Sequence, residues 1–280
     1  APAQDNLVES NTIIGGLYGV WINQTGATRT RVLGNVITDM TQIGIPLDTT
    51  DSNVIRGNLI RNSAVRGINL YSSQGNVIEQ NQVDSNPGYT IYIDGTSAGN
   101  VVRKNNIPVT PDSGVYNNTS KTHDFTRNWR GATDEVTIRT RIAGVGADSI
   151  TFRPYRLQQV DTAAGADTTA PAAPAGISIN AATPGQLTLT WVIPTLQEET
   201  NGGAIGYAGA KIYRLKSNPD TTQWANPANL VRTATSTETN WTDSAITGGD
   251  TYYYRISSFD AAPFVNQSFF ADTVYGFVTP

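Results

Sequence analysis

Two aspartates at equivalent positions of a repeating sequence, Asp48 and Asp94, are the best candidates for acid–base chemistry in this chain. Each follows a short apolar segment, and successive repeats place Asn23, Asp48, Tyr71 and Asp94 at the same position. If each repeat is one coil of a stacked structure, the two carboxyl groups are two strand spacings apart, about 9–10 Å. Two carboxyl groups at about this distance act as acid and base in glycosidases that invert the configuration of the sugar.

Aromatic and basic residues near the same strand ends could bind a sugar. Trp21, Tyr71 and Tyr92 could stack on sugar rings, because an aromatic side chain combines an apolar face with a polar tip. Arg66, together with Arg56, could bind the carboxylate of a uronate. The simpler interpretation, which we favour, is that acids at coil corners stabilise turns and that single aromatic residues pack. The catalytic residues are therefore unknown, and the two aspartates are candidates only.

Residue types that support metal or thiol chemistry are scarce. The chain has no cysteine, one methionine (Met40) and one histidine (His123), so we expect no disulfide, no metal site and no cofactor. His123 lies in an irregular stretch without a nearby serine or cysteine nucleophile motif, and we expect it at the surface. Phosphate-loop, calcium-loop and nucleophile-elbow patterns are also missing from the sequence.

Five Asn-x-Ser/Thr sequons could carry glycans if the source organism glycosylates its proteins. Such sites must be exposed, so we expect all five on the surface. They begin at Asn23, Asn117, Asn118, Asn240 and Asn266.

The elements that position these residues come from a repeat. Three segments that begin at Asn53, Asn76 and Asn100 superimpose without gaps, and weaker copies begin at Asn6 and Thr30. The second asparagine of each copy falls at positions 11, 35, 58, 81 and 105, so the steps are 24, 23, 23 and 24 residues. A second apolar segment has the same period, at residues 19–22, 44–47, 67–70 and 90–93. The alternation of apolar residues predicts short strands, and the fixed period predicts stacked coils.

The asparagines and the apolar residues of the repeat have different expected roles. We expect the asparagines at the corners, where they would adopt left-handed backbone geometry and bond their neighbours in the coils above and below. The alternative, that these asparagines bind a ligand, explains their spacing less well. The valine, isoleucine and leucine columns are expected to form the core, because each coil leaves an apolar face that its neighbour covers.

The Asn-x-Ile-x-x-Asn-x-Ile pattern over residues 6–107 resembles the right-handed parallel β-helix of extracellular carbohydrate-active enzymes and prokaryotic surface proteins. This resemblance implies an all-β solenoid of about five or six coils and does not imply one activity. Residues 124–131 are similar to the Asn-Trp-Trp-Gly segment that closes such solenoids, with Arg130 in place of the second tryptophan. We expect final strands at 136–142 and 150–157 and place the solenoid at 1–159.

The C-terminal part has the sequence features of a second β domain. Residues 160–175 are rich in Pro, Ala and Thr and predict an extended linker. Residues 176–280 show short alternating strands with frequent turns, which are typical of a β-sandwich. Trp191 and the Tyr-x-Tyr-Arg segment at 252–255 resemble a fibronectin type III domain, and the resemblance places Tyr252 at its tyrosine corner.

Composition limits the location and the partners. The formal net charge is -4 and charged residues make up 15% of the chain, so no basic face for nucleic acid is expected. No stretch approaches the roughly 20 apolar residues that a membrane span needs. The chain opens on Ala-Pro-Ala-Gln, which suggests a processed N-terminus. We therefore expect a secreted or cell-surface protein.

Two functional hypotheses follow from the repeat and its residues. The favoured one is a non-enzymatic surface protein that assembles, even into filaments, because the repeat begins at Asn6 and leaves little sequence to cap the first coil. Its partner would be a second copy or upstream domains of a longer chain. The alternative is a polysaccharide lyase, glycoside hydrolase or carbohydrate-binding adhesin that uses the face carrying Asp48 and Asp94, with a cell-surface glycan as ligand.

Overall fold

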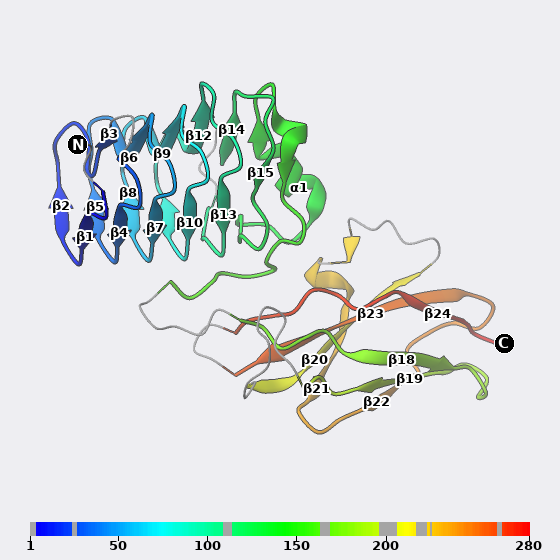
Figure 1. Cartoon of the computed structure of the whole chain (residues 1–280). Coiled ribbons are helices and arrows are strands. Elements are labelled where there is room, and N and C mark those ends of the chain that lie inside the picture. Colours follow the sequence, from blue (N-terminus) through cyan, green and yellow to red (C-terminus); the bar gives the residue numbers. More distant parts are fainter. Residues whose placement is uncertain are drawn as a thin grey trace. The chain divides into compact units, whose positions relative to one another are not determined.

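The chain forms two compact units, which are described separately (Figure 1). One comprises Ala1–Ala132 with Val136–Ala166, and the other Thr133–Glu135 with Asp167–Pro280. The computed structural model describes residues 4–23, 27–108, 114–162, 169–195, 206–216, 223–224, 226–261 and 265–280.

The first unit is a parallel β-solenoid whose coils contribute strands to three sheets (Figure 1). The seven-stranded sheet contains, in order, β1 (Leu7–Glu9), β4 (Arg31–Leu33), β7 (Val54–Arg56), β10 (Val77–Glu79), β13 (Val101–Arg103), β15 (His123–Asp124) and β17 (Ile150–Thr151). The four-stranded sheet contains β2 (Thr12–Ile14), β5 (Val36–Thr38), β8 (Leu59–Arg61) and β11 (Gln82–Asp84). The six-stranded sheet contains β3 (Ile22–Asn23), β6 (Ile43–Asp48), β9 (Arg66–Tyr71), β12 (Tyr89–Asp94), β14 (Val115–Asn117) and β16 (Ile142–Ala143). The predicted stacked-coil architecture is confirmed.

The register of the sheets follows the repeat and builds the core. Val32 pairs with Ile55, Ile55 with Ile78, and Ile78 with Val102, and all four side chains are fully buried. Because side chains alternate across a strand, the residues on either side of this column face outward. The apolar columns predicted from the sequence therefore line the interior of the solenoid.

A ladder of asparagines runs along the solenoid through Asn11, Asn35, Asn58, Asn81, Asn105 and Asn128. Each Nδ2 donates to the Oδ1 of the next asparagine at 2.9–3.1 Å. The same Oδ1 accepts the backbone N–H of the preceding asparagine at 2.9 Å. Every ladder residue except Asn11 is buried, so these bonds satisfy polar groups that water does not reach.

The expectation that the asparagines themselves adopt left-handed geometry is wrong. The positive φ belongs to the residue before each asparagine, as at Gly57 (67°), Gln80 (56°) and Lys104 (55°). The physical reason is that the left-handed residue bends the chain at the corner, and the residue after it then points inward. Only that inward position lets an asparagine reach the coils on both sides.

A short helix covers the last coil where a strand was predicted from the sequence. Residues 136–142 are mostly in α1 (Glu135–Thr140), and within the predicted strand 150–157 only Ile150–Thr151 is extended. Ile138 of α1 is fully buried and belongs to the solenoid core, while Val136 is 55% exposed. A helix bonds its own backbone internally, so it covers the apolar end of the core without creating a new open sheet edge.

The second unit is an antiparallel sandwich of a three-stranded and a four-stranded sheet (Figure 1). Its core contains Leu189, Trp191 and Ile256, all buried. The hydroxyl of Tyr252 accepts the backbone N–H of Thr247 at 3.0 Å, which confirms the predicted tyrosine corner. In order, the sheets contain β18 (Ala175–Asn180), β19 (Leu187–Val192) and β22 (Asn240–Asp243), and β21 (Leu230–Thr235), β20 (Tyr207–Lys216), β23 (Thr251–Asp260) and β24 (Val274–Phe277).

Candidate functional site

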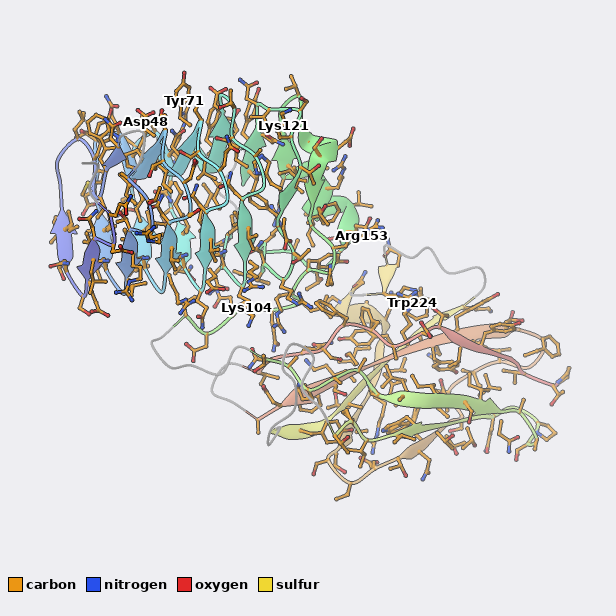
Figure 2. All side chains as sticks on the ribbon, in the orientation of Figure 1. Asp48, Tyr71, Lys104, Lys121, Arg153 and Trp224 are labelled. Carbon is orange, nitrogen blue, oxygen red and sulfur yellow. The ribbon has the colours of Figure 1, made fainter. Side chains whose placement is uncertain are left out.

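A column of polar and aromatic residues lies at the ends of the strands of the six-stranded sheet. Asn23 pairs with Asp48, Asp48 with Tyr71, and Tyr71 with Asp94, so the four residues are in register across four adjacent coils. Asn118 directly follows the Ile93–Asn117 pair and continues the column. Tyr71 is 48% exposed, and Asp48 and Tyr71 lie at the same edge of the solenoid (Figure 2). We call these five residues the edge column.

One oxygen of each carboxylate in the edge column is held by its own or the next coil. The Oδ1 of Asp48 accepts the hydroxyl of Thr49 at 3.0 Å. The Oδ1 of Asp94 accepts the N–H of Gly95 at 2.7 Å and the Nδ2 of Asn118 at 3.1 Å. These bonds restrict the carboxylates and leave the Oδ2 atoms as acceptors for a ligand. From the sequence, Asn118 was predicted only as a glycosylation site and not as a ligand-binding residue, although its position one repeat after Asp94 could have indicated it.

Two of the predicted ligand-binding residues, Tyr92 and Arg66, contact each other. The guanidinium carbon of Arg66 lies 3.5 Å from the centroid of the Tyr92 ring, and its Nη1 donates to Asn69 Oδ1 at 2.6 Å. On the other neighbouring coil, the Tyr116 ring stacks on Tyr92 with 5.1 Å between centroids and 2° between planes. Tyr89 packs against the same pair, 4.6 Å from Tyr116. Both faces of the Tyr92 ring are therefore covered, and its pKa is raised chiefly by burial.

Trp21, another of the three predicted aromatic ligand residues, lies in the first coil. Its side chain is 51% exposed, and its ring centroid is 5.2 Å from that of Tyr18. Ile22, the next residue, pairs with Leu47, so Trp21 is one coil away from Asp48. The structure thus leaves Trp21 and Tyr71 as the aromatic residues with accessible rings among the three proposed from the sequence.

The proposed uronate groove, which combined Arg56 with Arg66, is wrong. Arg56 belongs to β7 of the seven-stranded sheet, whereas Arg66 belongs to β9 of the six-stranded sheet. Arg56 forms an ion pair with Glu79, which also binds Arg103 Nε at 3.2 Å. β8 lies between β7 and β9 in the sequence, and the three strands belong to three different sheets of the coil, so Arg56 and Arg66 do not share a face.

His123 is buried, not at the surface as expected. It is 1% exposed and takes the place of an asparagine in a second ladder, where Asn100 Nδ2 lies 3.4 Å from its Nδ1. Burial lowers the pKa of His123 to about 4, so the imidazole is neutral at physiological pH. The histidine therefore caps a column of the solenoid interior and has no access to a substrate.

The predicted exposure of the five sequons is wrong for two of them. Asn117 is fully buried and donates to the carbonyl of Gly146 at 2.9 Å. Asn266 is 3% exposed and donates through Nδ2 to Asp260 at 2.8 Å. Both amides are consumed by internal hydrogen bonds, so a glycan would have to disrupt the fold. The exposed sequon asparagines are Asn23, Asn118 and Asn240.

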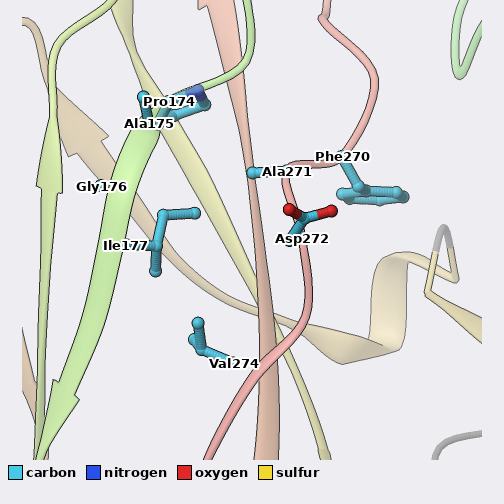
Figure 3. Close-up of a pocket in the computed structure, with 8 residues that line it drawn as sticks. All are labelled: Pro174, Ala175, Gly176, Ile177, Phe270, Ala271, Asp272 and Val274. Carbon is cyan, nitrogen blue, oxygen red and sulfur yellow. The ribbon is translucent and has the colours of Figure 1, made fainter.

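The sandwich carries a hollow of its own (Figure 3). Its volume is about 510 Å³, and it lies between the start of β18 and the segment that leads into β24. Asp272 is the one ionisable side chain among the residues that line it, with Ile177, Phe270 and Val274 among its apolar neighbours. This lining contains no pair of groups suited to catalysis. Among the described residues, no group of three or more His, Cys, Asp or Glu side chains could hold a metal ion. In the same part of the chain, no helix is long and apolar enough to span a membrane.

Comparison with known proteins supports the class of the first unit. Residues 1–129 match the family model "Right handed beta helix region". The chain is similar to the chicken CNTN1 FN1–FN3 domains, at 12% identity and a TM-score of 0.30 over 40% of this chain and a third of that one (33%). It is also similar to an Fn3-like protein from Clostridium thermocellum, at 23% identity and a TM-score of 0.27 over 39% and 94% of the two chains.

One solved structure is similar over most of the chain. It is the tailspike protein gp49 of Acinetobacter baumannii bacteriophage Fri1, a capsular polysaccharide depolymerase, at 11% identity and a TM-score of 0.26 over 92% of this chain and 52% of that one. These scores carry no argument about activity. Among curated proteins, none is significantly similar to this sequence. The protein combines a right-handed parallel β-helix with a fibronectin type III-like sandwich.

Proposed function

We propose that this protein is a secreted or cell-surface protein that binds a polysaccharide through the edge column without cleaving it. The observation that supports this proposal is the exposed ring of Tyr71, which lies in register between Asp48 and Asp94. A sugar ring can stack on an aromatic face while neighbouring carboxylates accept hydrogen bonds from its hydroxyl groups. The coils repeat this edge along the solenoid, which suits an extended ligand.

The position of Tyr71 also favours binding over hydrolysis. An inverting glycosidase needs the space between its two carboxyl groups for the sugar and for the attacking water. Here Tyr71 lies on the strand between the two aspartates. The side chain that would stack on a sugar therefore occupies the gap that hydrolysis needs.

Binding can be tested with Tyr71→Ala against immobilised neutral and acidic polysaccharides. We expect affinity to fall about 3- to 10-fold, the amount that one aromatic stacking contact contributes. Tyr275→Ala is the matched control, because Tyr275 is an exposed tyrosine (68%) of the sandwich. Equal loss in both variants, or binding of no polysaccharide by the wild-type protein, would contradict the proposal.

The enzymatic alternative is tested by product release. If Asp48 and Asp94 act as an acid–base pair, incubation with a bound polysaccharide releases new reducing ends or unsaturated products, and Asp94→Asn abolishes this release. Under the binding proposal, no product forms and Asp94→Asn changes only affinity. Product formation that depends on Asp94 would replace binding with catalysis as the function.

The first coil supports a second candidate function, which is assembly. Leu7 (48%), Ile14 (68%) and Leu17 (51%) are exposed there, together with Trp21. Clustered exposed apolar side chains favour protein–protein contacts. In addition, β1, β2 and β3 are edge strands of their sheets. If this coil mediates association, Ile14→Lys lowers the mass measured by light scattering from an oligomer to a monomer. Monodisperse wild-type monomers in electron micrographs would argue against assembly.

A further inference from the structure

Arg130, in the closing segment of the solenoid, is a fully buried charge. Arg130 is 1% exposed. Its three guanidinium nitrogens are buried and have no hydrogen-bond partner in the described part of the chain. It follows Asn128 and Trp129, where the asparagine ladder ends. Gln158 contributes another buried, unpartnered donor, Nε2, in the same closing part of the solenoid. Both side chains therefore present buried donors that no acceptor among the described residues satisfies.

Within the described part of the solenoid, no neighbouring group balances this charge. The guanidinium carbon of Arg130 lies 5.5 Å from the centroid of the Phe125 ring, which provides a modest cation–π contact. Arg141 donates to the carbonyl of Arg130 and so brings a second positive charge close by. Burial, and then Arg141, lower the pKa of Arg130 to about 9, so the side chain is still protonated at neutral pH. A buried, uncompensated cation is strongly destabilising, and folded proteins pair such charges.

We propose that Arg130 binds a small inorganic anion, of the size of chloride or nitrate, inside the closing segment. The guanidinium presents several donors in a planar fork, which suits a single anion held at close range. The burial of the site excludes larger organic anions. The anion would hold the closing segment, residues 125–131, in place and so stabilise the end of the solenoid core to which Ile138 of α1 also belongs. This inference is independent of the edge column.

The test is the melting temperature of the full chain at constant ionic strength, with chloride replaced stepwise by gluconate. Gluconate is too large for a buried site, so it serves as the inert anion. When free chloride rises from well below to about 100 times its dissociation constant, ligand linkage predicts an increase in the melting temperature of roughly 5 °C or more for a unit of this size. Nitrate should act like chloride.

Three variants make the result specific. Arg130→Met removes the charge but keeps the aliphatic stem, and we expect a melting temperature that no longer depends on chloride. Arg130→Trp introduces the second tryptophan of the Asn-Trp-Trp-Gly segment that residues 124–131 resemble, and its melting temperature should likewise not depend on chloride. This variant provides a second test in case Arg130→Met folds poorly. Arg61→Met is the control, because Arg61 is an exposed arginine of β8, and its chloride dependence should match the wild type.

A crystal grown with bromide gives the direct readout. We expect one anomalous peak within hydrogen-bond distance of the Arg130 guanidinium, and no peak there in Arg130→Met. A wild-type melting temperature that does not respond to chloride would overturn the proposal. So would a carboxylate of the chain itself seated on Arg130, or a bromide peak without any chloride-dependent stability, which would mark an adventitious ion only.

Discussion

At the scale of the residue, equivalent positions of successive coils can hold different residue types, with different consequences for stability. His123 replaces an asparagine in a buried column, and it does so as a neutral imidazole because burial lowers its pKa from 6.5 to about 4. Gln80 occupies a left-handed corner that glycine fills one coil earlier, at Gly57. His123 makes the stability depend on pH, and Gln80 adds backbone strain. Neither replacement changes the fold.

The buried imidazole makes the solenoid sensitive to acid. Between pH 6.5 and about 4 the unfolded chain binds a proton at His123 that the folded chain does not. The contribution of His123 to the free energy of unfolding is therefore constant above about pH 6.5 and falls as the pH drops, by at most about 1.4 kcal/mol per pH unit. Urea unfolding at pH 7.5 and pH 5 measures the loss.

His123→Asn is the informative variant, because asparagine stands at the two preceding positions of the column, Asn76 and Asn100. We expect this variant to lose less stability than the wild type between pH 7.5 and pH 5. Identical losses in the two proteins would show that His123 does not contribute to the acid sensitivity.

The corner residue Gln80 offers a stabilising change. A left-handed conformation costs a residue with a Cβ roughly 1–2 kcal/mol, and glycine avoids this cost but loses more chain entropy on folding. We therefore expect Gln80→Gly to raise the free energy of unfolding by up to about 1 kcal/mol and Gly57→Gln to lower it by a similar amount. Chemical denaturation of both variants checks the opposite signs.

At the scale of the element, strand pairing keeps Asp48, Tyr71 and Asp94 in register, and the asparagine ladder adds side-chain hydrogen bonds between the same coils. Asn81 in its middle donates to the carbonyls of Ile55 and Glu79, at 2.9 and 3.0 Å, and to the next asparagine. Each coil is thus tied to its neighbours by side chains as well as by strand pairing. The ladder thus adds to the strand pairing that aligns the edge column, although its own residues are not part of that column.

Removal of one ladder residue should destabilise the solenoid strongly. Asn81→Ala leaves buried backbone groups without partners, each at a cost of about 1–3 kcal/mol. Asn11→Ala is the control, because Asn11 lies at the exposed end of the same ladder, and we expect it to cost less than about 1 kcal/mol. Equal destabilisation, measured by urea unfolding, would contradict a structural role for the interior of the ladder.

At the scale of the whole molecule, the two units have separate hydrophobic cores. The sandwich core includes Trp191 and Tyr254, and the solenoid core is built from the isoleucine and valine columns. Separate cores make each unit a cooperative system of its own. The segment between them begins on the solenoid, where Val160 exchanges two 2.7 Å hydrogen bonds with the side chain of Asn106.

Calorimetry of the full chain should therefore resolve two transitions. Tyr252→Phe removes the hydroxyl that accepts the N–H of Thr247, and we expect it to destabilise the sandwich by about 1 kcal/mol. The transition of the solenoid should stay in place. A shift of both transitions together would show that the two units unfold as one.

Local periodicity in the sequence was sufficient to predict the stacked coils, the core columns and a second β domain, whereas the tyrosine corner at Tyr252 was implied by the resemblance to a fibronectin type III domain. Strand register follows directly from a repeat of 23–24 residues, because equivalent residues of successive coils must pair. For the same reason the alignment of Asp48, Tyr71 and Asp94 could be predicted before their surroundings were known.

Only the tertiary structure decided what each aligned residue can reach. Whether Tyr92 is free to bind depends on Arg66 and Tyr116, which adjacent coils bring to its two faces. The burial of His123 depends on its column, and that of Arg130 on packing in the closing part of the solenoid, where Phe125 and Arg141 contact it. Periodicity describes the spacing along one chain, but burial and contact arise from packing between coils, where side-chain orientation at each corner determines the outcome.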